Sequence, residues 1–420
     1  MLNMPFRRNT FSRGGPYMIY RLEVENFYSI RDRQVVDLTV GGKVPDEPGR
    51  LFPTYDDSEE RAPRVVAVYG PNASGKSNLL KAISFLAWFV HSSFRYDTGK
   101  QLPYRKFASN SMVESPTRIS ITFALPENLL DPENSPTCPY VYTLELAPRG
   151  AGPDRVILES VYHRPKGAKR FTRVLERNER GEVKGALGIG LGKERGVLEK
   201  ILRPDASVIA TLAQLNNKIA TDFVEAAGSI ISNILITRHE AETGQILELY
   251  ASNTDLLGAL NRDIRRIDLG VEEIKILARN GAPVAMFTHS GLEHQIEMDF
   301  ESHGTQQFLR LFPLLYQTLA LGGVAVIDEL DAAIHPVVLP EILRWFGDET
   351  RNPNGAQLWI SCHSTSLLDD LLKEEILFCE KTSDGATEVF ALKDVQGIRR
   401  SENFGSKYLG GVYGAVPRIG

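Results

Sequence analysis

The sequence has few cysteines, three among 420 residues. Cys138, Cys362 and Cys379 lie far apart, and no two of them form a Cys-x-x-Cys pair. This spacing predicts neither a disulfide framework nor a zinc site, and it is compatible with a reducing compartment. We therefore expect a cytoplasmic protein.

The sequence also lacks a hydrophobic run that could span a membrane. The longest apolar stretch, residues 311–327, is interrupted by Pro313, Gln317 and two glycines, and two acidic residues follow it. It predicts a helix followed by a buried strand. Residues 1–17 are basic and polar and have no apolar segment, so we predict a disordered tail there and no signal sequence.

Neither sign of charge is in large excess, since the formal net charge is -5. Any contact with nucleic acid must therefore come from a local patch. The basic segment 164–177 is the best candidate for such a patch, although a solvated hairpin tip is the favoured explanation for it. The hydrophobic share of 42% and the charged share of 24% are typical of a soluble globular protein. The length predicts two or three lobes.

A phosphate-binding loop follows a short β-branched run at residues 65–69. The segment Gly70-Pro-Asn-Ala-Ser-Gly-Lys76-Ser77 has the form G-x-x-x-x-G-K-S, with a predicted strand before it and a predicted helix after it. Backbone N–H groups of such a loop face the phosphates of a nucleotide, Lys76 reaches the β- and γ-phosphates, and the Ser77 hydroxyl binds Mg²⁺. The residues predicted to contact ATP here are Gly70, Asn72, Ala73, Ser74, Gly75, Lys76, Ser77 and Asn78.

A second motif ends in two carboxylates. Residues 323–327 form an apolar run, as expected for a strand that is buried on both faces, and Asp328 and Glu329 follow directly. We predict that Asp328 holds Mg²⁺ and that Glu329 orients and deprotonates the attacking water.

Two further segments complete the set. Residues 301–307, Glu-Ser-His-Gly-Thr-Gln-Gln, precede a helical pattern and place Ser302, Gly304 and Thr305 at a helix N-terminus, which is a typical anion site. A kinase has no need of such a segment, whereas an ATPase that holds nucleotide between two protomers needs a second phosphate cradle. After the acidic pair, the strand 357–361 leads to His363, which is predicted to sense or stabilise the γ-phosphate.

In this order, the motifs GPNASGKS, ESHGTQQ, VAVIDE and SCHS resemble the ABC-type ATPase heads of the RecF, SMC and OLD group. The opening YRLEVENFYSI is similar to the N-terminal strands of that group. The ending KYLGGVYGAVPRIG resembles bacterial AAA-family ATPases that are encoded beside a nuclease or toxin subunit.

The resemblance implies how the site is assembled. Ser302, Gly304 and Thr305 would contact the γ-phosphate of a nucleotide on the partner's loop, and residues 330–332 would form the D-loop at the dimer interface. The segment departs from the LSGGQ of transporters, which argues against a transporter subunit. Gln101 lies roughly where a Gln-loop would occur. The Toprim nuclease of longer family members has no counterpart here, so we expect a separately encoded effector.

The predicted fold is an α/β ABC-type P-loop head with a mixed sheet, split in sequence by an inserted lobe. Residues 18–125 would form its N-terminal half, 126–285 the inserted lobe of a β-meander and helices, and 286–420 its C-terminal half.

The leading hypothesis is an ATP-hydrolysing switch, a homodimer or higher oligomer, that senses nucleic acid or a foreign protein. It would control a nuclease or toxin in anti-phage defence. A stand-alone RecF-like DNA-repair ATPase and a non-hydrolysing, ATP-dependent scaffold are the alternatives.

Overall fold

The computed structural model describes residues 18–416, except 46, 151, 186–188, 190, 193, 240–241, 268–269, 333 and 335. The predicted tail at 1–17 therefore lies outside the described residues. Among them, no helix has both the length and the apolar character that a membrane crossing requires. The apolar stretch 311–327 forms the end of a helix and a buried strand, as predicted.

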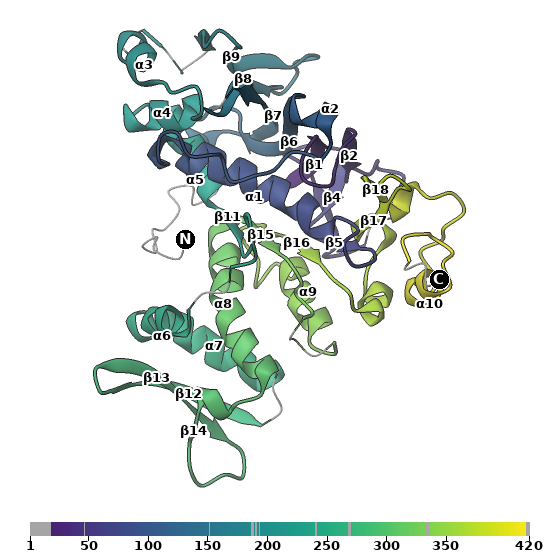
Figure 1. Ribbon diagram of the computed structural model, residues 1–420. Helices are drawn as coiled ribbons and strands as arrows, with labels where there is room; N and C mark the ends of the chain where they lie inside the picture. The colour runs from purple at the N-terminus through teal and green to yellow at the C-terminus, as the bar shows by residue number, and fades with distance from the viewer. Residues whose placement is uncertain are drawn as a thin grey trace.

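The largest sheet is antiparallel and has the strand order β10-β9-β8-β7-β6-β1-β2. Its strands are β1 (Ile19–Glu25), β2 (Gln34–Asp37), β6 (Thr117–Pro126), β7 (Thr137–Arg149), β8 (Gly152–His163), β9 (Thr172–Arg177) and β10 (Val183–Gly185). Alternating apolar residues in β1 and β6 explain why these segments form strands with one buried face. The sheet is the upper layer in Figure 1.

The second sheet has the order β11-β15-β16-β5-β17-β18, and all its pairs except β17–β18 are parallel. Its strands are β5 (Val65–Tyr69), β11 (Ile230–Ser232), β15 (Val324–Ile327), β16 (Gln357–Ser361), β17 (Ile376–Lys381) and β18 (Thr387–Ala391). The central strands β5, β15 and β16 are buried at every residue. Their continuous apolar runs are what a sheet covered on both faces requires.

The helix α1 (Lys76–Ser92) lies between the two sheets (Figure 1). Val66 and Val68 of β5 face the core that α1 shares with the antiparallel sheet. Val65, Ala67 and Tyr69 face a second core on the other side, which is formed with α8, α9 and α10. Because successive residues of a strand point to opposite faces, one short strand supplies both cores. The loop that precedes α1 is thus fixed by packing on both sides.

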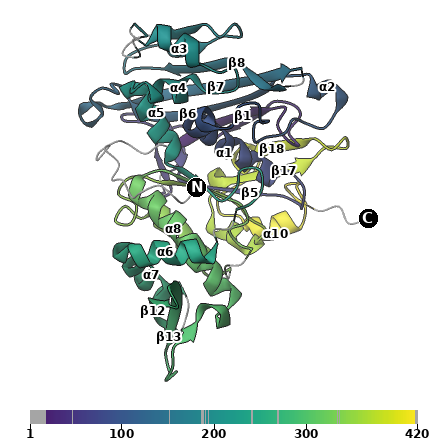
Figure 2. The same cartoon turned by 60° about the vertical axis from the view of Figure 1, so that its left-hand side comes forward.

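The remaining elements cover these layers and extend them at one end. They are α2 (Asn110–Val113), α3 (Arg195–Ile201), α4 (Val208–Gln214), α5 (Lys218–Gly228), α6 (Thr243–Ser252), α7 (Thr254–Ile267), α8 (His303–Leu321), α9 (Leu339–Gly347), α10 (Phe404–Leu409), β3 (Leu51–Pro53), β4 (Arg61–Pro63), β12 (Val271–Arg279), β13 (Ala282–His289) and β14 (Ile296–Glu297). Figures 1 and 2 show α6, α7 and the β12–β13 hairpin at the end of the molecule opposite the antiparallel sheet.

The structure corrects the predicted division into lobes. Residues 126–285 were expected to form one insertion, but β7 pairs with β6 and continues the sheet of β1. Further along the chain, β11 pairs in parallel with β15 of the second sheet. Within the described part of residues 126–285, α6, α7 and the β12–β13 hairpin lie apart from both sheets (Figure 2). Local patterns predict strands but not their pairing partners, so the boundary at residue 126 was placed between two paired strands.

The buried amide of Gln357 connects the two sheets. Its Oε1 accepts from the backbone N of Ile19 in β1 at 2.9 Å and from the indole N–H of Trp359 at 3.0 Å. Its Nε2 donates to the backbone O of Ile19 at 2.9 Å and to that of Pro63 at 3.1 Å. Each polar atom of this side chain therefore has two partners, as a fully buried amide requires.

Replacing this amide should destabilise the fold. We expect Gln357→Leu to lower the free energy of unfolding by about 2–4 kcal/mol, because buried backbone and indole groups lose their partners. Urea denaturation followed by circular dichroism measures the change. Gln295→Leu removes only an exposed bond to Thr288 and serves as the control. An equal loss in both variants would contradict a role for Gln357 in joining the sheets.

Candidate active site

Three of the four predicted motifs meet at one edge of the parallel sheet. The phosphate-binding loop follows β5, the acidic pair follows β15, and His363 follows β16. The pairing register places Val326 beside Trp359, and Ser361 beside Val68. Because the strands are parallel, all three carboxyl ends point to the same edge, where ligands of open α/β sheets bind.

The backbone of the loop has the left-handed conformations that its glycines allow. Gly70 has φ 145°, Ala73 has φ 62°, and Gly75 has φ 111°. A Cβ at Gly70 would lie 2.1 Å from the carbonyl oxygen of Cys379, and a Cβ at Gly75 would lie 2.3 Å from Oγ1 of Thr387. Both positions therefore require glycine, for conformation and for space.

Lys76 belongs to the loop motif and is also the first residue of α1. It is 6% exposed. Its Nζ donates to the carbonyl oxygens of Gly70 at 2.8 Å and Pro71 at 3.0 Å. Burial lowers the pKa of Lys76, while the carboxylates of Asp328 and Glu329 act in the opposite direction. The ammonium group is thus held at the sheet edge by carbonyl oxygens of the loop itself.

The loop also carries a buried hydroxyl without a hydrogen-bond partner among the described residues, Oγ of Ser74. Such an atom is costly unless a ligand or solvent satisfies it. Together with the backbone amides of the first turn of α1 and the ammonium group of Lys76, it fits a polyphosphate ligand. Ser77 lies in the first turn of the same helix, where it was predicted to bind Mg²⁺.

Residues that the sequence did not single out support the loop from behind. The Thr387 hydroxyl donates to the carbonyl oxygen of Ser74 at 2.7 Å and contacts Oγ of Ser29 at 2.8 Å. The amide of Asn78 donates to the same Ser29 oxygen at 2.8 Å. The predicted contact of Asn78 with nucleotide is untested, and in this structure its side chain bonds Ser29 behind the loop.

One hydroxyl holds the acidic pair in place. Ser361 at the end of β16 donates to Oδ1 of Asp328 at 2.6 Å and accepts from the backbone N of Glu329 at 2.8 Å. Asn233, which follows β11, bonds the backbone of Asp328 in both directions, at 2.8 Å and 3.1 Å. Asp328 is 5% exposed, so its carboxylate is buried and fixed, and its role in holding Mg²⁺ stays a prediction.

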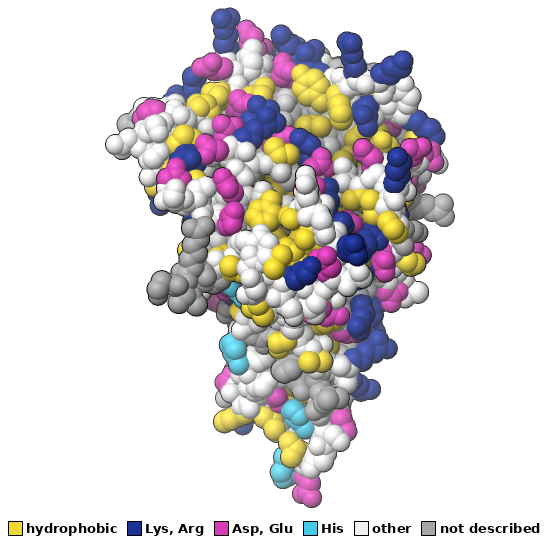
Figure 3. Space-filling model, turned by 90° about the vertical axis from the view of Figure 1, so that its right-hand side faces the viewer, with side chains coloured by type: hydrophobic (Ala, Val, Ile, Leu, Met, Phe, Trp, Pro, Cys, Tyr) yellow, Lys and Arg dark blue, Asp and Glu magenta, His cyan; other side chains and the backbone are white. Residues whose placement is uncertain are grey.

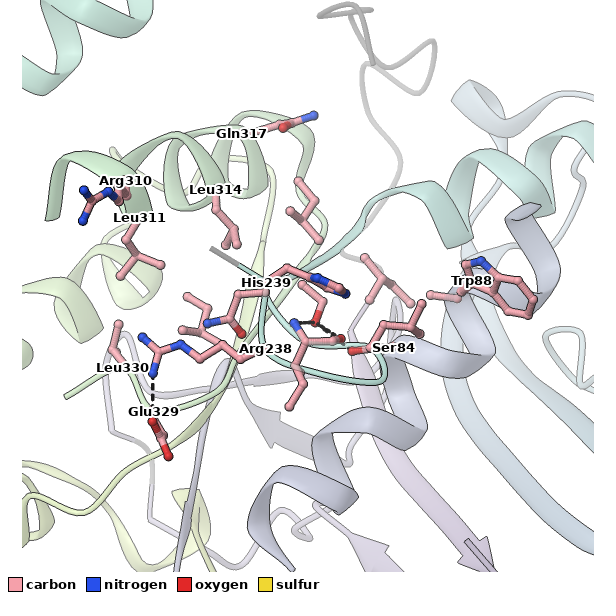
Figure 4. A pocket seen from close by; sticks show the side chains of 18 of the residues that line it. Ser84, Trp88, Arg238, His239, Arg310, Leu311, Leu314, Gln317, Glu329 and Leu330 are labelled. Atoms are coloured by element: carbon pink, nitrogen blue, oxygen red, sulfur yellow. Dashed lines mark hydrogen bonds and ion pairs between the residues drawn. The ribbon is translucent and has the colours of Figure 1, made fainter. Parts of the chain in front are cut away.

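Glu329, the predicted general base, has two unusual features. Its φ of 54° is a left-handed conformation that side chains other than glycine rarely adopt. Its Oε2 forms an ion pair with Nη1 of Arg238 at 2.8 Å, shown as a dashed line in Figure 4. The carboxylate is therefore engaged by a cation from the segment between β11 and α6.

The residues after the acidic pair contact the histidine segment. Oδ2 of Asp331 accepts from the backbone N of His363 at 2.6 Å and also from that of Ser364. The His363 side chain is exposed. The predicted D-loop is thus bonded to the predicted γ-phosphate sensor, and the imidazole is accessible to a ligand.

The segment 301–307 forms the helix start that the sequence predicts. Ser302 caps α8, since its Oγ accepts from the backbone N of Thr305 at 3.1 Å. Glu301 is held to β13 by Nε2 of His289 at 2.6 Å. Figures 1 and 2 show this end of α8 beside β12 and β13, apart from the loop between β5 and α1.

Two other sequence candidates lie elsewhere. Gln101 follows α1 and donates to the carbonyl oxygen of Gly152 at 3.2 Å. The basic segment 164–177 includes the tip of the β8–β9 hairpin, and its last residue, Arg177, is buried and bonds the backbone of Ala206. On the face in Figure 3, basic and acidic side chains are interspersed over the upper part of the molecule. Among the described residues, no group of three or more His, Cys, Asp or Glu side chains could hold a metal ion.

Sequence reasoning missed Arg238 and Thr387 because each acts across a long stretch of chain with no local pattern. Ser361 was within reach, since it lies in the segment Ser-Cys-His that was already identified. A small hydroxyl residue that ends a buried strand beside an acidic strand is a signal that could have been read.

Comparison with known proteins gives one family match. Residues 65–369 match the model of a family described as "AAA domain, putative AbiEii toxin, Type IV TA system". The comparison with curated proteins gives no match.

Solved structures similar to this chain include an SMC head domain from Thermotoga maritima, with 14% identity and a TM-score of 0.40; the match covers 89% of this chain and 98% of that one. Another is an Smc head domain with an extended coiled coil bound to the C-terminal domain of ScpA, derived from Pyrococcus furiosus. It has 11% identity and a TM-score of 0.43, and the match covers 90% of this chain and 97% of that one. The family model spans most of the chain and includes the phosphate-binding loop, the acidic pair and His363, so the chain belongs to this family of AAA-domain P-loop ATPases.

Proposed function

We propose that the protein is an ATP-hydrolysing switch in which two copies close on nucleotide and open after hydrolysis. The observation that carries this proposal is the separation of two anion-binding elements. The loop at residues 70–77 lies at the sheet edge, whereas the Ser302 helix start lies at the β12–β13 end of the molecule (Figures 1 and 2). A second copy is needed to bring one to the other.

Exposed hydrophobic side chains lie next to the segments that would form this interface. Phe300 is 80% exposed and precedes the Ser302 turn, and Val337 is 78% exposed and follows the predicted D-loop. Exposed large apolar side chains close to polar site residues are typical of protein interfaces. Both positions support a closed state in which these segments contact the partner copy.

The chemistry follows from the residues at the sheet edge. Lys76 and the loop amides would hold the phosphates, and Ser77 and Asp328 would hold Mg²⁺. Bound Mg²⁺ neutralises charge that develops on the phosphates. Glu329 would orient and deprotonate water once its carboxylate is released from Arg238, and His363 would stabilise the γ-phosphate.

The biological role that we propose is control of a separately encoded effector in anti-phage defence. The family description, which names a toxin and a Type IV system, supports this role. A switch between two assemblies can expose or hide a surface for the effector, because nucleotide binds one assembly better than the other. The trigger would be nucleic acid or a foreign protein in the cytoplasm.

A mixing experiment tests whether the site is shared between copies. Lys76→Ala should abolish ATP binding, and Ser302→Arg should block the anion site, so each variant alone should be inactive. A mixture of the two restores one complete site in each mixed dimer, so we expect about a quarter of the wild-type rate of phosphate release.

The control replaces Lys76→Ala with Lys100→Ala, whose side chain is exposed and pairs only with Asp97 among the interactions described here. That variant should keep the full rate by itself. No recovery on mixing, or full activity of Ser302→Arg alone, would contradict a site that is completed by the partner copy.

Replacing the general base should trap the closed state. We expect Glu329→Gln to reduce phosphate release roughly 100-fold or more and to keep ATP binding, because the amide cannot accept a proton. Size-exclusion chromatography with light scattering should then show an ATP-dependent dimer. If the wild-type protein releases no phosphate while still dimerising with ATP, it is a scaffold rather than an ATPase.

The trapped variant also tests the effector. ATP-loaded Glu329→Gln, used as bait for the protein encoded beside it, should retain that protein differently from Lys76→Ala, which cannot close. Equal retention by the two baits, or none by either, would contradict control of a neighbouring effector by the nucleotide state.

A further inference from the structure

A cavity of about 700 Å³ lies outside the phosphate-binding loop, between α1, the segment that joins β11 to α6, and α8. None of residues 70–77 lines it, but Glu329 and Leu330 do. Figure 4 shows Trp88 from α1, Arg310 and Leu314 from α8, and Arg238 around the same space. Its size is that of a site for a small organic ligand.

The charged groups of the cavity favour an anion. Arg238 and Arg310 both line it, and Glu329 is the one acid among its described lining residues. That acid already pairs with Arg238 at 2.8 Å. Arg310 donates to the hydroxyl of Thr243 at 3.2 Å. Because Thr243 is neutral, this contact does not compensate the charge of Arg310. An anionic group bound beside Arg238 or beside Arg310 would contact a guanidinium group.

The rest of the wall is apolar and aromatic. Leu311, Leu314, Ile327 and Leu330 line it together with the indole of Trp88. Amide side chains such as Gln307 and Gln317 lie among them on α8. A cavity that combines apolar walls with a few fixed polar groups selects a ligand with an apolar body and a polar head.

We propose that this cavity binds a small organic anion with an aromatic or aliphatic body, whose anionic group takes Arg238 from Glu329. The site rests on the proposed function in one respect, since release of Glu329 matters for hydrolysis only if Glu329 is the general base. In this proposal the anion competes with Glu329 for the guanidinium group of Arg238. The ligand is thus an activator.

The competition can be measured without hydrolysis. The probe is 8-anilinonaphthalene-1-sulfonate, an aromatic anion whose fluorescence rises in apolar sites, and its neutral analogue N-phenyl-1-naphthylamine lacks the sulfonate. Trp88 lines the cavity, whereas Trp345 and Trp359 are buried elsewhere. The signal is energy transfer from tryptophan to the bound probe. The part of this signal that disappears in Trp88→Phe reports a probe bound in the cavity. Full-length protein carrying Lys76→Ala excludes binding at the nucleotide loop.

In this background, Arg238→Gln should weaken binding of the sulfonate roughly tenfold, because a charge-assisted contact is lost, and should leave the neutral analogue unchanged. Glu329→Gln should tighten binding of the sulfonate severalfold, because the competing carboxylate is gone. Arg279→Gln breaks an exposed pair with Glu297 on the distal hairpin and should change nothing. Unchanged sulfonate binding in Arg238→Gln, or equal weakening of the neutral analogue, would overturn the site.

Hydrolysis by the protein with an intact loop supplies the second measurement. Saturating sulfonate should raise the rate of phosphate release severalfold in the wild type. The rate of Arg238→Gln should not respond to sulfonate, because Glu329 is already released from residue 238 in that variant. Binding without a change in rate overturns the activator role. If the protein hydrolyses no ATP, the proposed function is contradicted instead. The opposite changes in sulfonate affinity expected for Arg238→Gln and Glu329→Gln still decide whether the anion and Glu329 compete.

Discussion

The active-site geometry depends on the parallel register of β5, β15 and β16. This register brings Ser361 beside the acidic pair, so a single hydroxyl can bond the carboxylate of Asp328 and the backbone N–H of Glu329 at the same time. The O–H donates once and the oxygen accepts once, which satisfies the hydroxyl and fixes both acids relative to each other. A slip of one residue would point Ser361 to the other face of the sheet. The relative positions of Asp328 and Glu329 are therefore set by backbone pairing.

The antiparallel sheet contributes to the same site, although it carries none of the predicted catalytic residues. Gln357 bonds both backbone groups of Ile19, so β1 is fixed to the strand that ends in Ser361. The turn after β1 brings Ser29 to Thr387, which bonds the carbonyl oxygen of Ser74 in the loop. These hydrogen bonds thus join two sheets that also share the core around α1. Because a close-packed interior transmits displacement, the loop and the antiparallel sheet are expected to move as one body.

The sequence was sufficient to predict local structure wherever a motif depends only on neighbouring residues. The loop before Lys76, the acidic pair and the cap at Ser302 each depend on neighbours within a few residues, and their forms were read correctly. The continuity of β6 with β7, the support from Thr387 and the pairing of Arg238 with Glu329 join residues that are remote along the chain. Hydrophobic periodicity reports which face of a strand is buried, but it carries no information about which strand lies next to it. For the same reason, no pattern in the segment before α6 indicates that Arg238 reaches the acidic pair.

The strength of the Arg238–Glu329 pair decides whether the pair can restrain Glu329 reversibly. The side chains are 29% and 43% exposed, and a pair in such contact with solvent contributes at most about 1 kcal/mol. Phosphate contacts or a competing anion can supply more than this, so the pair restrains Glu329 without locking it. The left-handed backbone of Glu329, φ 54°, acts in the same direction, because strain of about 1–3 kcal/mol at one residue favours a second conformation once its contacts are lost. Held by a weak pair on a strained backbone, the Glu329 carboxylate is poised between two states, and the proposed nucleotide-driven switch would need that property at its general base.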